Sequence, residues 1–188
     1  MFQNYVEKST QKVLQILDIA VSEMSAMKEN LLTPDFILIA LLSQKDAEAV
    51  KILEDLLPDH RNAIRNIVET VRSRHQHTTS VQASQVVASQ EVSELFRMAH
   101  DEAQAFGDDY IGTGTLFLAL FDPKAGPVSE VLRDAGITQE QARQALRNQR
   151  GGRALKEQDA ETREDPLKKY TRDLTELARA GELDPVIG

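Results

Sequence analysis

The residues best suited to metal binding are two histidines, His75 and His77, whose spacing could form half of a metal site. They stand in the polar stretch 75–87, which contains no carboxylate to complete such a site. Because a structural zinc ion takes four protein ligands, the pair is more typical of a solvated loop. The chain contains no cysteine, which excludes disulfides and thiolate metal sites and fits a reducing compartment. We predict no metal site.

Two further groups of charged residues could carry chemistry. The acidic residues Asp101, Glu102, Asp108 and Asp109 could hold a cation or act as an acid–base pair, but catalytic carboxylates need burial that separates their pKa values. Their pattern is typical of a helix face and a loop. No combination of nucleophile, base and acid can be singled out. We therefore predict no catalytic residue and no cofactor-binding residue in this chain.

Four arginines could bind phosphate, at positions 61, 65, 72 and 74. Arg65 and Glu69 have the i,i+4 spacing that pairs charges on a solvated helix face, which favours the simpler interpretation. The net charge of −8 also argues against a nucleic-acid partner, because nucleic-acid binding requires a basic face. The longest apolar run, Phe36–Leu42, is far shorter than the ~20 residues that span a bilayer. We expect a soluble, cytoplasmic protein with no signal peptide and no membrane partner.

The candidate residues lie in a chain whose sequence contains an internal repeat. Residues 9–71 match 88–150 after a shift of 79 positions, with apolar character kept at nearly every core-type position. Thr10 then corresponds to Ser89, and Ala40-Leu41 corresponds to Ala119-Leu120. A repeated unit buries the same face twice, so the pattern predicts a domain with pseudo-two-fold symmetry and a candidate groove at the seam between its copies.

Each copy is predicted to form four helices. In the first copy Thr10 caps a helix that ends near 28–30, and Thr33-Pro34 begins a short, wholly apolar helix that should be the buried centre of its copy. Two more helices follow, over about 46–57 and from 58 onward. The second copy predicts helices over 89–106, 115–121 and 128–135, and a last helix capped by Thr138.

The fold class is therefore all-α: a pseudo-two-fold double repeat of a four-helix motif, followed by a flexible linker and a short helix. The charged and Gly-rich composition after the repeat predicts the linker, and an apolar stripe after Pro166 predicts the short helix. The predicted divisions are an N-terminal extension 1–9, a double-repeat domain 10–148 with copies 10–74 and 88–148, a flexible linker 149–164, and a final segment 165–188.

Two motifs give the chain a resemblance to a known family. The stretch Tyr110–Leu120, YIGTGTLFLAL, looks like the Gly-Thr-Glu-His-Leu-Leu-x-Ala-Leu element of the N-terminal domain of Clp-family AAA+ unfoldases. The stretches Leu167–Thr175 and Gly181–Gly188 resemble the segment that leads into the first ATPase module of that family. The chain is similar to the ClpB- and ClpC-like members, and its tail leans toward the ClpB disaggregases. The resemblance covers about 10–188.

The resemblance implies a role in binding and not a reaction. In this family the N-terminal domain captures unfolded or aggregated protein clients, or adaptor proteins, and passes them to an ATPase ring. The parent would be a homohexamer that uses ATP and magnesium in AAA+ modules absent here, so this chain should be a monomer without ATPase activity. A stand-alone adaptor or structural interaction protein with the same fold is the alternative.

Three residues are predicted to line the binding groove at the seam: Phe96, Met98 and Tyr110. Met98 lies off the apolar stripe of its helix, which then shows more apolar surface than one core face needs. We place Asp108 and the pair of Asp35 with Thr10 at the polar edges of this groove. For Phe96 and Tyr110, packing inside the second copy is the competing interpretation.

The chain departs from the family motif at one position that bears on this site. Gly114 stands where the family often has glutamate, whereas the first copy has Asp35 there. A carboxylate near the capping hydroxyl of the first helix forms part of a polar recognition site in some relatives. The resemblance therefore implies that Thr10 with Asp35 could keep such a site. The Ser89 side has lost its acid, so two equivalent sites for a ligand such as phosphorylated arginine are not expected.

Overall fold

A computed structural model describes residues 2–75 and 86–162. The helix predicted after Pro166, the residue His77 and most of the polar stretch between the copies lie outside the described residues. The described chain is built from helices, with two strands of two residues each. The predicted all-α class is confirmed.

The helical elements follow the predicted order. The first copy contains α2 (Gln11–Ala26), α3 (Pro34–Ser43), α4 (Glu48–Leu56) and α5 (His60–Ser73). The second contains α6 (Gln90–Ala105), α7 (Thr113–Ala119), α8 (Val128–Asp134) and α9 (Gln139–Arg150), with a 3-10 turn, η1 (Pro123–Ala125), before α8. A shift of 79 positions brings the first residues of α2, α3 and α5 onto the first residues of α6, α7 and α9, which confirms the repeat.

The helix starts are fixed by capping residues. The hydroxyl of Thr10 accepts a hydrogen bond from the Val13 amide, and the hydroxyl of Ser89 accepts the equivalent bond from Val92, both at 3.2 Å. These bonds satisfy backbone donors that the first turn of a helix leaves without a partner. Thr138 forms a capping box with Gln141 at the start of α9. The first helix of each copy, α2 or α6, therefore begins with a hydroxyl side chain that caps it in the same way.

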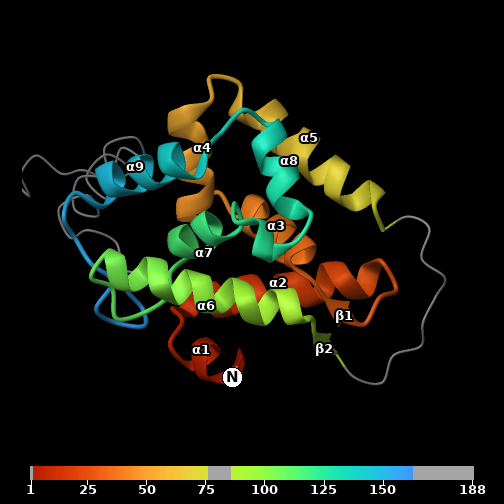
Figure 1. Cartoon of the computed structure of the whole chain (residues 1–188), viewed down its shortest axis with the longest axis horizontal. Helices are drawn as coiled ribbons and strands as arrows, with labels where there is room; N and C mark the ends of the chain where they lie inside the picture. Colours follow the sequence, from red (N-terminus) through yellow and green to blue (C-terminus); the bar gives the residue numbers. More distant parts are fainter. Residues whose placement is uncertain (1, 76–85, 163–188) are drawn as a thin grey trace, which may run out of the picture.

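The two helices of the repeat that are buried on all sides, α3 and α7, form the centre of the molecule. Figure 1 shows α3 and α7 between α2 and α6 on one side and α4, α5, α8 and α9 on the other. All of α3 from Pro34 to Leu42 and all of α7 are buried. Phe36 and Phe117 are among the largest side chains with no exposed surface. A helix that is apolar on every side has to lie in the interior, which is why the repeat places one such helix in each copy.

The two copies are joined by exchanged contacts. The strands β1 (Leu31–Leu32) and β2 (Val87–Ala88) pair in parallel, with Leu32 opposite Ala88. An isolated parallel bridge joins Ser9 to Ile111. A shift of 79 positions converts one pairing into the other, so the chain before the first helix of each copy pairs with the chain before the second helix of the other copy. This exchange holds the two halves together as one domain.

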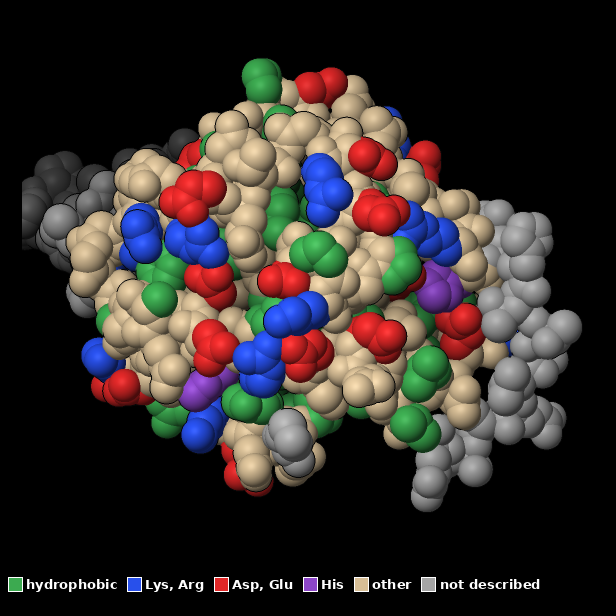
Figure 2. Space-filling view, viewed as in Figure 1, with side chains coloured by type: hydrophobic (Ala, Val, Ile, Leu, Met, Phe, Trp, Pro, Cys, Tyr) green, Lys and Arg blue, Asp and Glu red, His purple; other side chains and the backbone are tan. Residues whose placement is uncertain are grey.

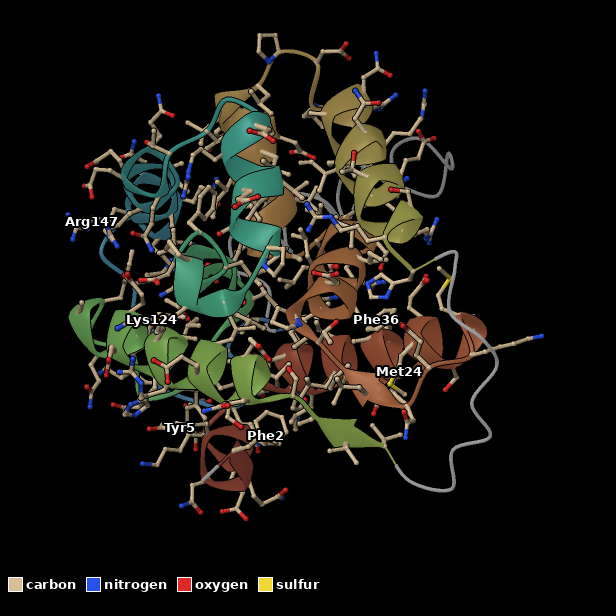
Figure 3. The ribbon with its side chains drawn as sticks, turned by 45° about the vertical axis from the view of Figure 1, so that its right-hand side comes forward. Phe2, Tyr5, Met24, Phe36, Lys124 and Arg147 are labelled. Atoms are coloured by element: carbon tan, nitrogen blue, oxygen red, sulfur yellow. The ribbon has the colours of Figure 1, made fainter. Side chains whose placement is uncertain are left out.

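A helix that the sequence did not predict covers one side of the second copy. α1 (Phe2–Glu7) falls in the segment treated as an extension, and it lies beside α6. The Phe2 ring meets the Phe96 ring edge to face, with 5.2 Å between their centres, and Tyr5 lies close to His100 (Figure 3). An edge-to-face pair of this kind stabilises by about 0.5–1.5 kcal/mol beyond its buried area.

Charged side chains of both signs are spread over the face shown in Figure 2, and apolar side chains lie there in small separate groups. Within 2–75 and 86–162, none of the helices has the length and apolar character needed to cross a bilayer. Large apolar side chains are exposed in these ranges at only three positions, and all three belong to β1, β2 or the residue before β2: Leu31, Val86 and Val87.

The repeat alignment makes a direct prediction for stability. Leu41 and Leu120 are equivalent positions, and neither has any exposed surface. Changing either to alanine should lower the free energy of unfolding by about 2–5 kcal/mol, because each change removes buried methyl groups and leaves a cavity. Urea denaturation of each variant measures this, with Lys51→Ala on the exposed side of α4 as the control. Two near-neutral results would contradict the inferred equivalence.

Candidate functional site

A buried ion cluster lies where α4, α9 and the loop between α6 and α7 meet. The Arg150 guanidinium donates from Nε to Glu48 Oε2 at 2.5 Å and from Nη1 to both carboxylate oxygens of Asp108, at 2.8 and 3.0 Å. The side chain of Asp108 has no exposed surface, and that of Arg150 is 6% exposed. The predicted polar-edge residue Asp108 is therefore an internal partner of Arg150 and not a surface contact.

Electrostatics explains why these charges can be buried. Burial by itself would lower the pKa of the Arg150 guanidinium. The charges and hydrogen bonds of Glu48 and Asp108 outweigh that effect and hold the pKa above its usual value. Asp108 also accepts the Leu155 amide at 2.8 Å, which ties the segment after α9 to the cluster. A buried charge needs this kind of complete pairing, because an unpaired one costs several kcal/mol.

The segment after α9 differs from the flexible linker predicted for 149–164. Leu155 is buried, the Asp109 amide donates to the Leu155 carbonyl at 2.8 Å, and the Gln11 amide donates to the Gln158 carbonyl at 2.8 Å. The described part of this segment, up to residue 162, therefore lies against the helical domain. The Gly- and charge-rich composition of the segment predicted that it would not pack against the domain, but the burial of Leu155 and several polar contacts dock it.

The carboxylate beside Thr10 comes from this segment. The Thr10 hydroxyl donates to Glu161, and the Glu161 carboxylate also accepts the Thr113 amide at 2.8 Å and the Thr113 hydroxyl at 2.6 Å. The prediction that Asp35 pairs with Thr10 is wrong. Because the copies exchange contacts, Thr10 lies beside the start of α7 in the second copy, where position 114 is glycine.

Asp35 instead anchors the end of α5. His75 contacts Asp35 Oδ2 through Nε2 at 2.8 Å and Glu29 Oε2 through Nδ1 at 2.7 Å, and its ring lies against Phe36. Burial by itself would lower the pKa of His75, but the hydrogen bonds and charges of Asp35 and Glu29 raise it above the ordinary value of 6.5. The histidine considered as a metal ligand is thus part of an ion-paired clamp in the first copy.

Two of the predicted groove residues belong to the core. Phe96 has no exposed surface and is covered by Phe2, and Met98 is 8% exposed. The extra apolar surface inferred from the position of Met98 exists on the isolated helix, but neighbouring elements cover it. Ser89 is buried as well, as the cap of α6. These three residues do not line an open groove in this structure.

Tyr110 is the predicted wall residue that reaches an open hollow. It is partly exposed and borders a hollow of about 680 Å³, whose lining is mostly polar or charged. The other lining residues come from α1, α6, the α6–α7 loop and the segment after α9: Glu7, Lys8, His100, Gln104, Gly107, Asp108, Asp109 and Lys156. The sequence predicted an apolar groove at the seam between the copies, with Tyr110 in its wall, whereas the hollow that Tyr110 borders is mostly polar or charged.

The acidic residues that the sequence offered for chemistry form ion pairs in the described structure. Arg97 pairs with Glu94 and with Asp101, Arg143 pairs with Glu102, and Lys156 lies 3.5 Å from Asp109. Across the described ranges no group of three or more His, Asp or Glu side chains is arranged so that it could hold a metal ion. The acidic residues considered for chemistry are thus parts of ordinary ion pairs.

The comparisons with known proteins agree with this architecture. The family model described as "Clp repeat (R) N-terminal domain" matches residues 8–135. The chain belongs to this Clp repeat family. The match contains both of the capping residues that begin the two copies, Thr10 and Ser89.

The curated relatives that match the chain include proteins named as a chaperone and as a heat-shock protein. The chain is 32% identical over 186 residues to "Chaperone protein ClpB" of Brucella suis, covering 97% of this chain and 21% of the relative. It is 34% identical over 181 residues to "Heat shock protein 104" of Schizosaccharomyces pombe, covering 95% and 20%. The chain thus spans about a fifth of the length of the curated relatives it matches.

Solved structures show the same fold. The N-terminal domain of Hsp104 from Candida albicans superposes with a TM-score of 0.64 at 16% identity, covering 82% of this chain and 99% of that domain. The N-terminal domain of the ClpV1 ATPase from E. coli superposes with a TM-score of 0.63 at 17% identity, covering 76% and 86%. The Clp N-terminal fold is therefore kept at low sequence identity.

The ion cluster predicts a large effect of one substitution. Arg150→Ala should lower the free energy of unfolding by about 3–5 kcal/mol, because it leaves the buried carboxylate of Asp108 without a counter-charge. Thermal or urea unfolding checks this, with Arg61→Ala on the exposed surface of α5 as the control. Adding Asp108→Asn to Arg150→Ala should recover part of the loss. Equal effects of the two arginine changes would contradict the role given to the cluster.

The His75 clamp predicts a pH dependence. Its pKa is raised in the folded state, so folding takes up a proton between the unfolded and folded pKa values. The stabilisation should be fully present below pH 6.5 and should be lost as the pH rises through the folded pKa. His75→Asn should cost about 1–3 kcal/mol at low pH and less at high pH. Unfolding of both proteins across this range measures the difference, and a constant difference would contradict the clamp.

Proposed function

We propose that this chain is the N-terminal domain of a Clp-type, ATP-dependent chaperone and that it binds unfolded or aggregated protein clients, or adaptor proteins. The family match over residues 8–135 carries the proposal. The named relatives, ClpB and heat shock protein 104, are chaperones and heat-shock proteins by their descriptions. The chain offers surfaces for binding and, in its described part, no arrangement of residues for catalysis.

The exposed apolar patch at the seam is the surface that we propose for clients. The patch consists of Leu31, Val86 and Val87, which are 45%, 51% and 51% exposed. β1 comes from the first copy and β2 from the second, so the patch lies where the copies meet. Clustered apolar side chains that remain exposed on a folded domain suit the exposed apolar stretches of unfolded chains. The repeat predicted a binding surface at the seam between the copies, but it did not predict that Leu31, Val86 and Val87 would form it.

The hollow at Tyr110 is a separate surface with different chemistry. Its charged lining suits the polar surface of a folded adaptor better than an apolar stretch of unfolded chain. We assign adaptor binding to it and client binding to the apolar patch. The two assignments can be tested one at a time, because the patch lies at β1 and β2 whereas the hollow lies between α1 and the end of α6.

The properties of the whole protein are part of the same proposal. We propose a cytoplasmic homohexamer whose ATP and magnesium bind in AAA+ modules outside this chain, with this chain monomeric on its own. The similarity to ClpB extends over 97% of the chain, beyond the helical domain. That extent favours a chaperone segment over a stand-alone adaptor or structural protein.

Client binding predicts a measurable loss on changing the patch. The double variant Leu31→Ser with Val87→Ser should weaken binding of a permanently unfolded protein about tenfold or more, because two apolar contacts are lost. The wild-type affinity should be micromolar or weaker, since a disordered client must be ordered on binding. Reduced, carboxymethylated α-lactalbumin titrated into the isotope-labelled chain, followed by NMR, measures both.

The control is Lys51→Ser on the exposed side of α4, which should bind as the wild type does. Amide shifts should concentrate at Leu31, Val86 and Val87. Shifts confined to Tyr110 and its neighbours would move the client site to the hollow. No shift with several unfolded proteins would contradict client binding by this domain and leave adaptor binding as the function to test.

A further inference from the structure

The segment after α9 has the contacts of a releasable element. The amides of Gln11 and Asp109 donate to its backbone carbonyls, the Leu155 amide donates to the Asp108 carboxylate, and the Arg153 amide donates to the Arg150 carbonyl. Gln158 adds a side-chain bond to the Ser9 carbonyl at 3.3 Å. Leu155 is the one large apolar side chain that the described part of this segment buries. These contacts are made to helix ends and loops of the domain, so the segment can open without unfolding the helices.

One carboxylate fastens the far end of this segment. Glu161 accepts hydrogen bonds from the Thr10 hydroxyl and from both the amide and the hydroxyl of Thr113. The three donor groups belong to two threonines, Thr10 at the start of α2 in the first copy and Thr113 at the start of α7 in the second. Glu161 therefore bridges the two copies while it holds the segment down.

A glycine in the domain makes room for the docked segment. A Cβ atom at position 112 would lie 2.4 Å from Leu155 Cδ1 and 3.2 Å from the Glu161 carboxyl carbon. The backbone at Gly112, with φ −100° and ψ 174°, is one that any residue adopts. The missing side chain thus serves close approach and not backbone conformation. Gly112→Ala should weaken docking, because Leu155 and Glu161 would have to move aside, while leaving the helices intact.

We propose that residues 151–162 form a strap that docks reversibly on the domain, with Glu161 as its latch and Leu155 as its apolar anchor. Docked, the strap covers Thr10, Gly112 and Thr113. Released, it uncovers these groups and adds at most about 40 Å of extended chain between the domain and whatever follows it. The strap goes beyond the proposed function, since it would set the reach of the domain whichever partner the domain binds.

The charges around the latch make release depend on pH. Glu161 lies near Glu48 on α4, and Arg150 on α9 is already paired with Glu48 and Asp108. Burial and the charge of Glu48 raise the pKa of Glu161 above its ordinary value of 4.5, although the bonds from Thr10 and Thr113 act the other way. An acid whose pKa is raised on docking docks best when protonated. The strap should therefore be held most firmly at low pH and loosen as the pH rises.

Amide hydrogen exchange of the full 188-residue chain tests the strap without any client. The amides of Gln11 and Asp109 are the reporters, because their hydrogen bonds go to the strap and not to a helix. Glu161→Ala and Gly112→Ala should each speed exchange at both amides by about tenfold or more, and amides inside α3 should stay protected. Glu130→Ala, at an exposed position of α8, is the control and should change neither reporter.

A second arm follows pH. After correction for intrinsic exchange rates, protection of the Gln11 amide in the wild type should fall from about pH 5 to about pH 8. Glu161→Gln, which cannot ionise, should remove that dependence. Unchanged reporter exchange in both Glu161→Ala and Gly112→Ala would overturn the strap. Loss of α3 protection together with the reporters would also overturn it, because the segment would then be part of the core.

Discussion

The buried guanidinium of Arg150 is the contact on which the second half of the molecule depends. It satisfies Asp108, whose side chain has no exposed surface, and it reaches Glu48 in the first copy. Asp108 in turn fixes the Leu155 amide, and the Glu48 carboxylate approaches the amide of Gly114 at the start of α7. One cation thus sets the positions of α4, α7, α9 and the chain after α9. The ion pairs of Arg150 affect the free energy of unfolding because they are buried, since exposed ion pairs contribute little to it.

The exchange of contacts between the copies decides what each capping residue meets. Thr10 begins the first copy but lies beside Ile111 of the second, and Ser89 begins the second but lies beside Leu32 of the first. Reasoning within one copy therefore pairs the wrong residues. The carboxylate that the first copy carries on α3 serves His75, whereas the hydroxyl of Thr10 is met by Glu161 from the end of the described chain.

The surface of this Clp repeat domain has two features of different chemistry. The apolar patch at β1 and β2 offers contact area without direction, and this is why we propose it for clients. The hollow at Tyr110 offers charged groups in fixed places, and this is why we propose it for an adaptor. The acidic residues Asp101, Glu102, Asp108 and Asp109 are engaged in ion pairs with basic side chains.

The helices of the two copies, the repeat and the central position of α3 and α7 were predictable from the sequence, because each rests on local periodicity, capping residues or a run of apolar residues. The short helix α1 was not predicted. Tertiary structure alone decided which residues remain exposed. The stripe of α6 shows Phe96 and Met98 as apolar, but only packing reveals that both are covered, Phe96 by Phe2 of α1. The tertiary structure also shows that a Gly- and charge-rich segment docks on the domain. This docking depends on hydrogen bonds that join Leu155 and Glu161 to residues more than 40 positions away in the chain. Burial and long-range pairing are properties of the folded chain, so a local pattern does not contain them.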